Sequence, residues 1–175
     1  LVYSCGKNTN GQLGLGNYNN ISIPTEITTL TGCNINKVVC GDYHTIFLNT
    51  SNNLVYSCGK NTNGQLGLGN YYNISIPTEI TTLTGCNINK VVCGNNYTLF
   101  FNTNNNLVYY CGNNNLINKL NYQSLLSYAP SAPVSGPFDT VSTYTPEIHT
   151  PQLITSLNNL NINTVVCGNS NIIFY

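Results

Sequence analysis

The eight cysteines are the residues best able to bind a metal ion or to form disulfides. They fall into three groups that recur along the chain, and no two of them form a Cys-x-x-Cys motif. The groups are Cys5, Cys58 and Cys111; Cys40, Cys93 and Cys167; and Cys33 and Cys86. Zinc sites commonly use Cys-x-x-Cys, whereas cysteine is also among the residues most often buried. We therefore expect structural thiols in the core, with metal or disulfide sites as the alternatives.

Asp42 and His44 form a second candidate for chemistry, because a carboxylate near an imidazole can act as an acid–base couple. No nucleophile and no further carboxylate accompany them, so a hydrogen bond from His44 into its own turn is the simpler expectation. The glycine-rich loop at 11–16 lacks the helix and the Lys-Ser/Thr of a phosphate-binding loop, so we expect Leu13 and Leu15 to pack inward from it. These patterns predict no catalytic residue, no metal-binding residue and no cofactor.

All of these residues belong to a sequence repeat with a period of 53 residues. Residues 1–53 and 54–106 are nearly identical, and a third, diverged copy covers 107–175. A fixed period of this length predicts a repeat architecture, in which each unit buries its apolar face against its neighbours. We expect one repeat domain over residues 1–175.

Each copy holds four short β-rich runs separated by Gly, Asn and Pro. The runs are Leu1–Cys5, Pro24–Thr28, Asn36–Cys40 and His44–Leu48; Leu54–Cys58, Pro77–Thr81, Asn89–Cys93 and Tyr97–Phe101; and Leu107–Cys111, Pro151–Thr155, Asn163–Cys167 and Asn171–Tyr175. No segment carries the apolar period of a helix, which predicts an all-β fold. Residues 49–53 are expected to form a tight hairpin loop, because Asn tolerates positive φ.

Charge is scarce in this chain, which has five basic and five acidic residues and a net charge of zero. Without a basic surface to neutralise a phosphate backbone, binding of nucleic acid by charge is not expected. No run approaches the roughly 18 consecutive apolar residues of a membrane helix, so we expect no membrane span. The absence of Met predicts that the sequence is an excerpt of a longer reading frame.

Three motifs recur in the first two copies: Gly-Gln-Leu-Gly at 11–14, a Pro-led strand from Pro24, and Val-Cys-Gly-Asp-Tyr-His-Thr at 39–45. In the second copy the third motif reads Val-Cys-Gly-Asn-Asn-Tyr-Thr at 92–98, which fits the family pattern equally well apart from Tyr97 in place of the histidine. Together they resemble the repeat of the regulator of chromosome condensation family, over the whole chain except about 113–150. Members of this family resemble closed seven-bladed β-propellers, and a four-stranded unit repeated radially is a propeller blade. The absence of Trp argues against the light-sensing branch of the family, which depends on clustered tryptophans.

The resemblance implies an all-β, partial β-propeller of about three four-stranded blades, an excerpt of a larger, closed propeller. Sequence repeat and blade are expected to be staggered, with one blade running from Asn36 to Thr81 and the next from Asn89 to Thr155. Leu1–Thr28 then supplies an outer half-blade and Asn163–Tyr175 an inner half-blade. We expect an open arc with exposed edges, which missing blades or a second chain would cover.

The third copy departs most from the pattern, with 40 positions from Cys111 to Pro151 against 19 from Cys5 to Pro24. The Pro/Ser-rich insertion at about 113–150 is expected to be an extended or disordered loop. The alternative is a protruding arm with a function, as long loops on rigid scaffolds often have. In the founding member of the family, a wedge projecting from the propeller promotes nucleotide release from the small GTPase Ran, and the resemblance permits that role for this insertion.

Three of the seven differences between the first two copies fall together in one turn. The residues that differ are Asp42, Tyr43 and His44 in the first copy, and Asn95, Asn96 and Tyr97 in the second. The staggered arrangement places this turn at one rim of the propeller, where partners commonly dock. We therefore take these six residues as the candidate partner-binding site, with relaxed constraint on an exposed turn as the alternative.

The resemblance implies a non-catalytic, protein-interaction propeller with another protein as its partner, in the cytoplasm or the nucleus. Its most concrete form is regulation of a small GTPase by guanine-nucleotide exchange. One alternative is a scaffold or substrate-recognition domain of a larger protein such as a ubiquitin ligase. Two others are a lectin-like propeller, for which aromatic and amide side chains would have to recur in every blade, and a decaying repeat expansion without a distinct activity.

Overall fold

The computed structural model describes residues 1–113, 148–157, 165–167 and 172–174, which form β-strands and three short 3-10 helices. The first six strands are β1 (Tyr3–Gly6), β2 (Ile21–Glu26), β3 (Lys37–Cys40), β4 (His44–Asn49), β5 (Leu54–Gly59) and β6 (Ile74–Glu79). They are followed by β7 (Lys90–Cys93), β8 (Tyr97–Asn102), β9 (Leu107–Gly112), β10 (Ile148–Leu153), β11 (Val165–Cys167) and β12 (Ile172–Phe174). The 3-10 helices are η1 (Thr28–Leu30), η2 (Thr81–Leu83) and η3 (Thr155–Leu157).

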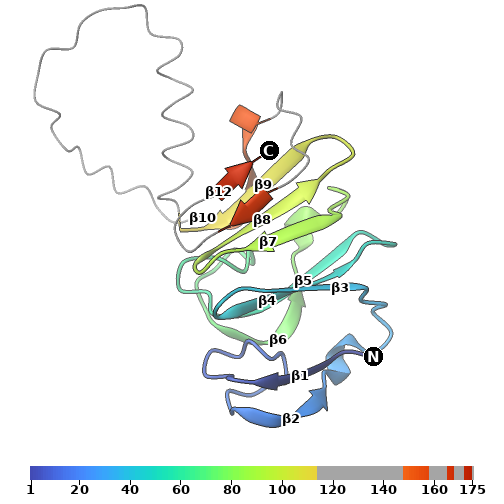
Figure 1. Ribbon diagram of the computed structural model, residues 1–175, viewed down its shortest axis with the longest axis vertical. Coiled ribbons are helices and arrows are strands. Elements are labelled where there is room, and N and C mark those ends of the chain that lie inside the picture. The colour runs from blue at the N-terminus through green and yellow to red at the C-terminus, as the bar shows by residue number, and fades with distance from the viewer. Residues whose placement is uncertain (114–147, 158–164, 168–171, 175) are drawn as a thin grey trace, which may run out of the picture.

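The strands form two complete blades and two half-blades, all antiparallel, and this confirms the partial propeller and its stagger. The first blade has the order β3-β4-β5-β6, and the second blade has the order β7-β8-β9-β10. The pair β1-β2 is the N-terminal half-blade, and the pair β11-β12 is the C-terminal half-blade. Figure 1 shows these units stacked along the long axis as an open arc, with β1 and β2 at one end and β11 and β12 at the other.

The tight hairpin within each blade also agrees with the expectation. Between β4 and β5 the chain turns over residues 50–53, and Asn53 has a φ of +57°. Asn106 takes the same conformation, with a φ of +54°, in the second blade. Asn is one of the few residues that adopt this left-handed region at little cost, so the asparagines end these loops.

The outermost strand of each blade begins three residues before its proline, which corrects the expected strand starts at Pro24, Pro77 and Pro151. β2, β6 and β10 all start at an isoleucine, and the chain is already in a 3-10 turn where the strand was expected to end. Proline is tolerated inside these strands because they lie at the edge of the sheet, where the missing N–H breaks no ladder bond. The insertion expected at about 113–150 lies largely outside the described residues.

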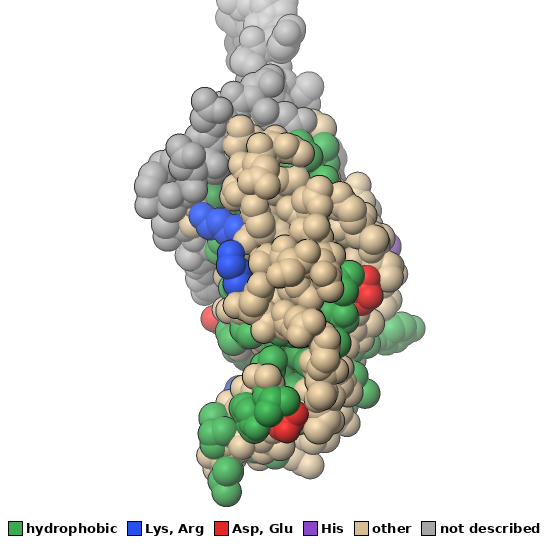
Figure 2. All heavy atoms as spheres, turned by 90° about the vertical axis from the view of Figure 1, so that its right-hand side faces the viewer, with side chains coloured by type: hydrophobic (Ala, Val, Ile, Leu, Met, Phe, Trp, Pro, Cys, Tyr) green, Lys and Arg blue, Asp and Glu red, His purple; other side chains and the backbone are tan. Residues whose placement is uncertain are grey.

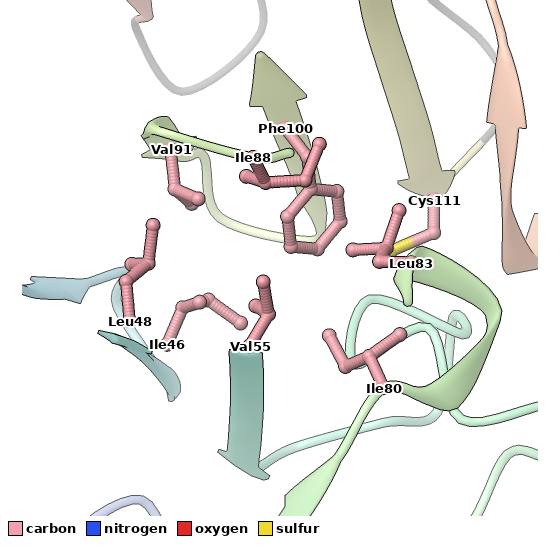
Figure 3. Packing of buried hydrophobic residues seen from close by; sticks show 9 residues of the cluster. All are labelled: Ile46, Leu48, Val55, Ile80, Leu83, Ile88, Val91, Phe100 and Cys111. Atoms are coloured by element: carbon pink, nitrogen blue, oxygen red, sulfur yellow. The ribbon is translucent and has the colours of Figure 1, made fainter. Parts of the chain in front are cut away.

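The core lies between the blades rather than inside one sheet. Ile46, Leu48 and Val55 of the first blade point toward Val91 and Phe100 of the second (Figure 3). Each of these side chains is buried, and full burial of one such side chain contributes about 1.5–3 kcal/mol. Neighbouring blades therefore stabilise one another, as the repeat period predicts.

The glycine-rich loop after β1 packs on the outer strand of the first blade, as expected. Gly16 donates its N–H to the carbonyl of Ser75 (2.9 Å), and a side chain at Gly11 would collide with the Ser75 backbone. Gly11 has a φ of +82°, which favours glycine. Leu13 of this loop is buried and Leu15 is half-buried. The loop thus links one blade to the next.

The cysteines whose side chains the structure describes are free thiols, and their burial follows their position in the arc. Cys58 and Cys111 are buried, and their Sγ atoms lie 3.5 and 3.3 Å from the carbonyls of Gln12 and Gln65 in the loop of the preceding repeat. Burial raises the pKa of both thiols. Cys5 and Cys40 are exposed, so the expectation of core thiols fails at the N-terminal end of the arc, where the described chain has no blade to cover them.

Candidate partner-binding rim

The two turns that carry the candidate residues lie at equivalent places, between β3 and β4 and between β7 and β8. Gly41 and Gly94 close the turns by donating their N–H groups to the carbonyls of His44 (2.8 Å) and Tyr97 (3.0 Å). The rings of these two residues pack over the same glycines, leaving no room there for a Cβ. The other four residues, Asp42, Tyr43, Asn95 and Asn96, are exposed or half-buried.

Two lysines join this turn of the first blade to its neighbours. Lys7 follows β1 and Lys60 follows β5, and their Nζ atoms lie 5.7 and 5.3 Å from the centre of the Tyr43 ring. A cation at this distance from an aromatic face is attracted by it. Lys60 also donates a hydrogen bond from Nζ to Oδ1 of Asn96 (3.3 Å). We call Asp42, Tyr43, Lys7, Lys60 and Asn96 the lysine rim.

The lysine contacts repeat from blade to blade. Tyr43 and Asn96 occupy the same position of the repeat, as do Lys7 and Lys60. In each case the lysine of one unit reaches the turn of the next unit. The sequence showed these lysines as repeat equivalents, but it gave no sign of the turn that each contacts. Each lysine directly follows the Cys-Gly that ends a strand, and this position in the sequence could have indicated that both lysines lie at the rim.

His44 is fully buried beneath the rim, and its hydrogen bond differs from the one expected. Its Nε2 lies 2.9 Å from Oγ1 of Thr98 in the second blade, not within its own turn. The Thr98 hydroxyl donates to the carbonyl of Gln65 (2.7 Å), so the imidazole must carry its proton on Nε2 and donate it to Thr98. Burial lowers the pKa of His44 to about 4, so the ring is neutral near pH 7.

Tyr97, the counterpart of His44, is buried in an apolar setting. Its ring stacks on that of Tyr110 with centroids 5.8 Å apart, inside the cluster between the second blade and the C-terminal half-blade. Ile172 packs against the same cluster and occupies the position that Thr98 holds one unit earlier. The residue at this repeat position therefore suits the residue that it meets in the next unit. The polar His44 bonds to Thr98, and Tyr97 lies in the same apolar cluster as Ile172. This matching accounts for the His44/Tyr97 difference by interior packing.

The chemistry available at the rim is recognition. It offers two ammonium groups that directly follow β1 and β5, and one carboxylate, a phenol and an amide in the short turns before β4 and β8. Among the residues that the structure describes, no three His, Cys, Asp or Glu side chains are grouped as metal ligands. No helix in the described part of the chain has the length and apolar character to span a bilayer.

The fold and the rim define a β-propeller repeat protein with a polar and aromatic rim. The model of the regulator of chromosome condensation (RCC1) repeat matches residues 1–48 and 52–101, and a second model of the same repeat matches 35–65. The chain belongs to the RCC1 repeat family.

Curated relatives include the ultraviolet-B receptor UVR8 of Arabidopsis thaliana, 36% identical over 99 residues, and the RCC2 homolog of Xenopus laevis, 38% identical over 107 residues. A third is the probable E3 ubiquitin-protein ligase HERC6 of Homo sapiens, 38% identical over 95 residues. These matches take in 57%, 61% and 53% of this chain, but only 22%, 20% and 9% of the relatives. The chain thus spans about a fifth or less of their length.

Solved structures share the fold. Human WBSCR16 superposes with a TM-score of 0.72 at 23% identity, covering 98% of this chain and 39% of that one. Prp20p of Saccharomyces cerevisiae, characterised with its binding to Gsp1p and histones, superposes with a TM-score of 0.61 at 15% identity, covering 98% and 38%. At these identities the likeness establishes the β-propeller architecture.

Proposed function

We propose that this chain is a protein-interaction propeller that regulates a small GTPase by stimulating guanine-nucleotide exchange, with the lysine rim as a contact surface. The observation that carries the proposal is the placement of Lys7 and Lys60 around Tyr43 at the strand ends of adjacent units. Tyrosine combines a large contact area with a polar group and is enriched at the energetic centres of interfaces. The structural likeness to Prp20p, which binds Gsp1p, supports the choice of partner.

Exchange requires binding energy and no covalent chemistry. A protein that binds the nucleotide-free GTPase more tightly than the nucleotide-bound form shifts the equilibrium toward release of the nucleotide. The shift equals the difference between the two affinities, so a tenfold preference corresponds to about 1.4 kcal/mol. A surface of ammonium, carboxylate and phenol groups on a rigid sheet scaffold is suited to such selective binding.

The test is release of fluorescent GDP from a panel of small GTPases in the presence of the chain. We expect release from one GTPase to accelerate well above its intrinsic rate. Tyr43→Ala should weaken this effect about tenfold or more, as loss of an interface tyrosine does. Ile23→Ala is the control for loss of an exposed side chain, because Ile23 is 73% exposed within the outer strand β2 and is not part of the lysine rim. No acceleration with any GTPase by the folded chain would refute the exchange proposal.

A second candidate is a scaffold or substrate-recognition domain, which the similarity to HERC6 favours. Such a domain binds its partner without releasing a bound nucleotide. The double variant Asp42→Asn, Tyr43→Asn tests the rim without disturbing the fold, because it gives these two positions the residues that the second turn has there and leaves the buried His44 in place. Partner binding that depends on these two positions but not on the nucleotide state would favour the scaffold.

A further inference from the structure

Charged side chains are few in this chain, yet two of its five lysines approach the same tyrosine. Figure 2 shows one face of the molecule, on which side chains coloured blue or red are few and most of the surface is uncharged. Lys7 and Lys60 belong to adjacent units, and their Nζ atoms lie 5.7 and 5.3 Å from the centre of the Tyr43 ring. The lysine rim is therefore a local concentration of positive charge in a chain without net charge.

The positive charge of the rim is not neutralised by an ion pair with the described part of the chain. Among the described residues, no Asp or Glu carboxylate forms an ion pair with Lys7 or Lys60. Lys60 donates one hydrogen bond to Oδ1 of Asn96 (3.3 Å), which is a neutral acceptor. Because an ammonium group has three N–H donors, further donors remain for a partner. Each lysine thus retains a charge and N–H groups that an external anion can bind.

Tyr43 gives these two ammonium groups a common aromatic surface. Its side chain is half-buried in the turn before β4, and its ring attracts the lysine charges. Tyrosine also combines a large apolar contact area with a polar hydroxyl group. A charge held against such a surface is less hydrated than a charge in open water, so it attracts an opposite charge more strongly. A carboxylate is therefore bound more firmly here than by an isolated surface lysine.

Comparison of the repeat copies shows that this combination is specific to the first turn. The second turn has one lysine, Lys60, instead of two, because the next position in the lysine series is Asn113. It also has two asparagines where the first turn has Asp42 and Tyr43. A side chain that recurs in every copy can be explained by the structure of the blade, whereas this combination occurs in the first copy alone. We therefore expect one binding site of this kind rather than one in each blade.

Asp42 restricts the kind of anion that the rim accepts. Its side chain is exposed in the same turn as Tyr43. A uniformly anionic polymer would bring negative charge to Asp42 as well as to the lysines, and like charges at short range repel. A peptide can direct its carboxylates to the lysines and an uncharged or basic side chain to Asp42. The mixed charge of the rim thus favours a protein segment over a phosphate backbone, in agreement with the zero net charge of the chain.

We propose that the lysine rim binds an acidic peptide segment of a protein partner, with its carboxylates on Lys7 and Lys60 and its apolar side chains on Tyr43. The ammonium groups donate charge-assisted hydrogen bonds to the carboxylates, which are stronger than bonds between neutral groups. This role of the lysines rests on the rim being a contact surface, as proposed above, and it specifies the chemistry of the partner. It does not require the partner to be a GTPase, so exchange and acidic-segment binding can fail separately.

The first test is binding of a short fluorescein-labelled peptide of alternating Glu and Ala, measured by fluorescence anisotropy, with a peptide of alternating Gln and Ala as the control ligand. Lys7→Gln and Lys60→Gln should each weaken binding of the acidic peptide about fivefold. Asp42→Asn should strengthen it, because this change removes a repulsive carboxylate. Lys37→Gln is the matched control and should leave the affinity unchanged, since Lys37 begins β3 and the rim turn follows the other end of that strand. Circular dichroism of each variant checks that the sheets remain folded.

The second test compares peptide binding with GDP release by the same variants. Binding of the acidic peptide by a chain that releases GDP from no GTPase would support the acidic segment and refute exchange alone. GDP release that Lys7→Gln and Lys60→Gln leave unchanged, without binding of the acidic peptide, would overturn the acidic segment and leave exchange standing. Equal affinity for the two peptides, an equal loss with Lys37→Gln, or binding to phosphatidylserine vesicles but not to the acidic peptide would each overturn the proposal.

Discussion

The buried His44 predicts that the chain loses stability in mild acid. Its pKa is about 4 in the folded chain against 6.5 as the ordinary value, so the unfolded state binds the extra proton between these limits. The contribution of the neutral His44 to the free energy of unfolding is fully present above about pH 6.5 and is lost as the pH falls toward 4. The difference of about 2.5 pKa units amounts to about 3 kcal/mol in all, of which about 2 kcal/mol is lost by pH 5.

The measurement is urea unfolding at about pH 7.5 and pH 5, followed by circular dichroism or tyrosine fluorescence, because the chain has 13 tyrosines and no tryptophan. In thermal unfolding the same loss lowers Tm by roughly 4–8 °C. His44→Gln keeps an N–H donor for Thr98 but does not titrate, so its stability should change little over this range. Equal pH dependence in His44→Gln and in the wild type would refute the reasoning.

Three further predictions concern the backbone and the thiols. Gly64→Ala should lower the free energy of unfolding, measured in urea, by more than about 2 kcal/mol, because Gly64 has a φ of +78° and the new Cβ would lie 2.7 Å from the Cα of His149. Gly32→Ala is the control, since Gly32 has a similar φ but open space around it, and it should lower the same free energy by about 1 kcal/mol. Asn53→Gly should be nearly neutral and Asn53→Val should cost roughly 1–2 kcal/mol, since Asn53 has a φ of +57°; equal stability of the two variants would contradict this. In dilute native chain an aromatic disulfide reagent should label Cys5 quickly and Cys58 only after unfolding, and comparable rates would show that the blades separate.

The architecture could be predicted because the information for it is local and repeated. The 53-residue period, the Gly-rich loops and the asparagine before β5 each specify a turn or a strand within a few residues. The strand starts at Pro24 and Pro77 were misplaced, because the tolerance of proline depends on the strand being outermost, which is a property of the sheet.

The contacts of the site could not be predicted, because they depend on which distant segments the stacked blades bring together. His44 and Thr98 are 54 positions apart and meet only because adjacent blades stack. Cys5 and Cys58 have the same sequence context, yet one is exposed and the other buried. Cys5 is exposed because it lies at the open end of the arc. The predicted open edge would therefore have been enough to predict that this cysteine is exposed.

The offset between repeat and blade also determines how such a chain can change in length. Any 53-residue window of the first two copies begins and ends at the same point of the blade, wherever the window is placed. Recombination between the nearly identical copies can therefore remove or add one unit at almost any position in the gene and still leave every strand with a neighbour of the same type. The number of blades then changes by one, while the interior of the remaining blades is preserved.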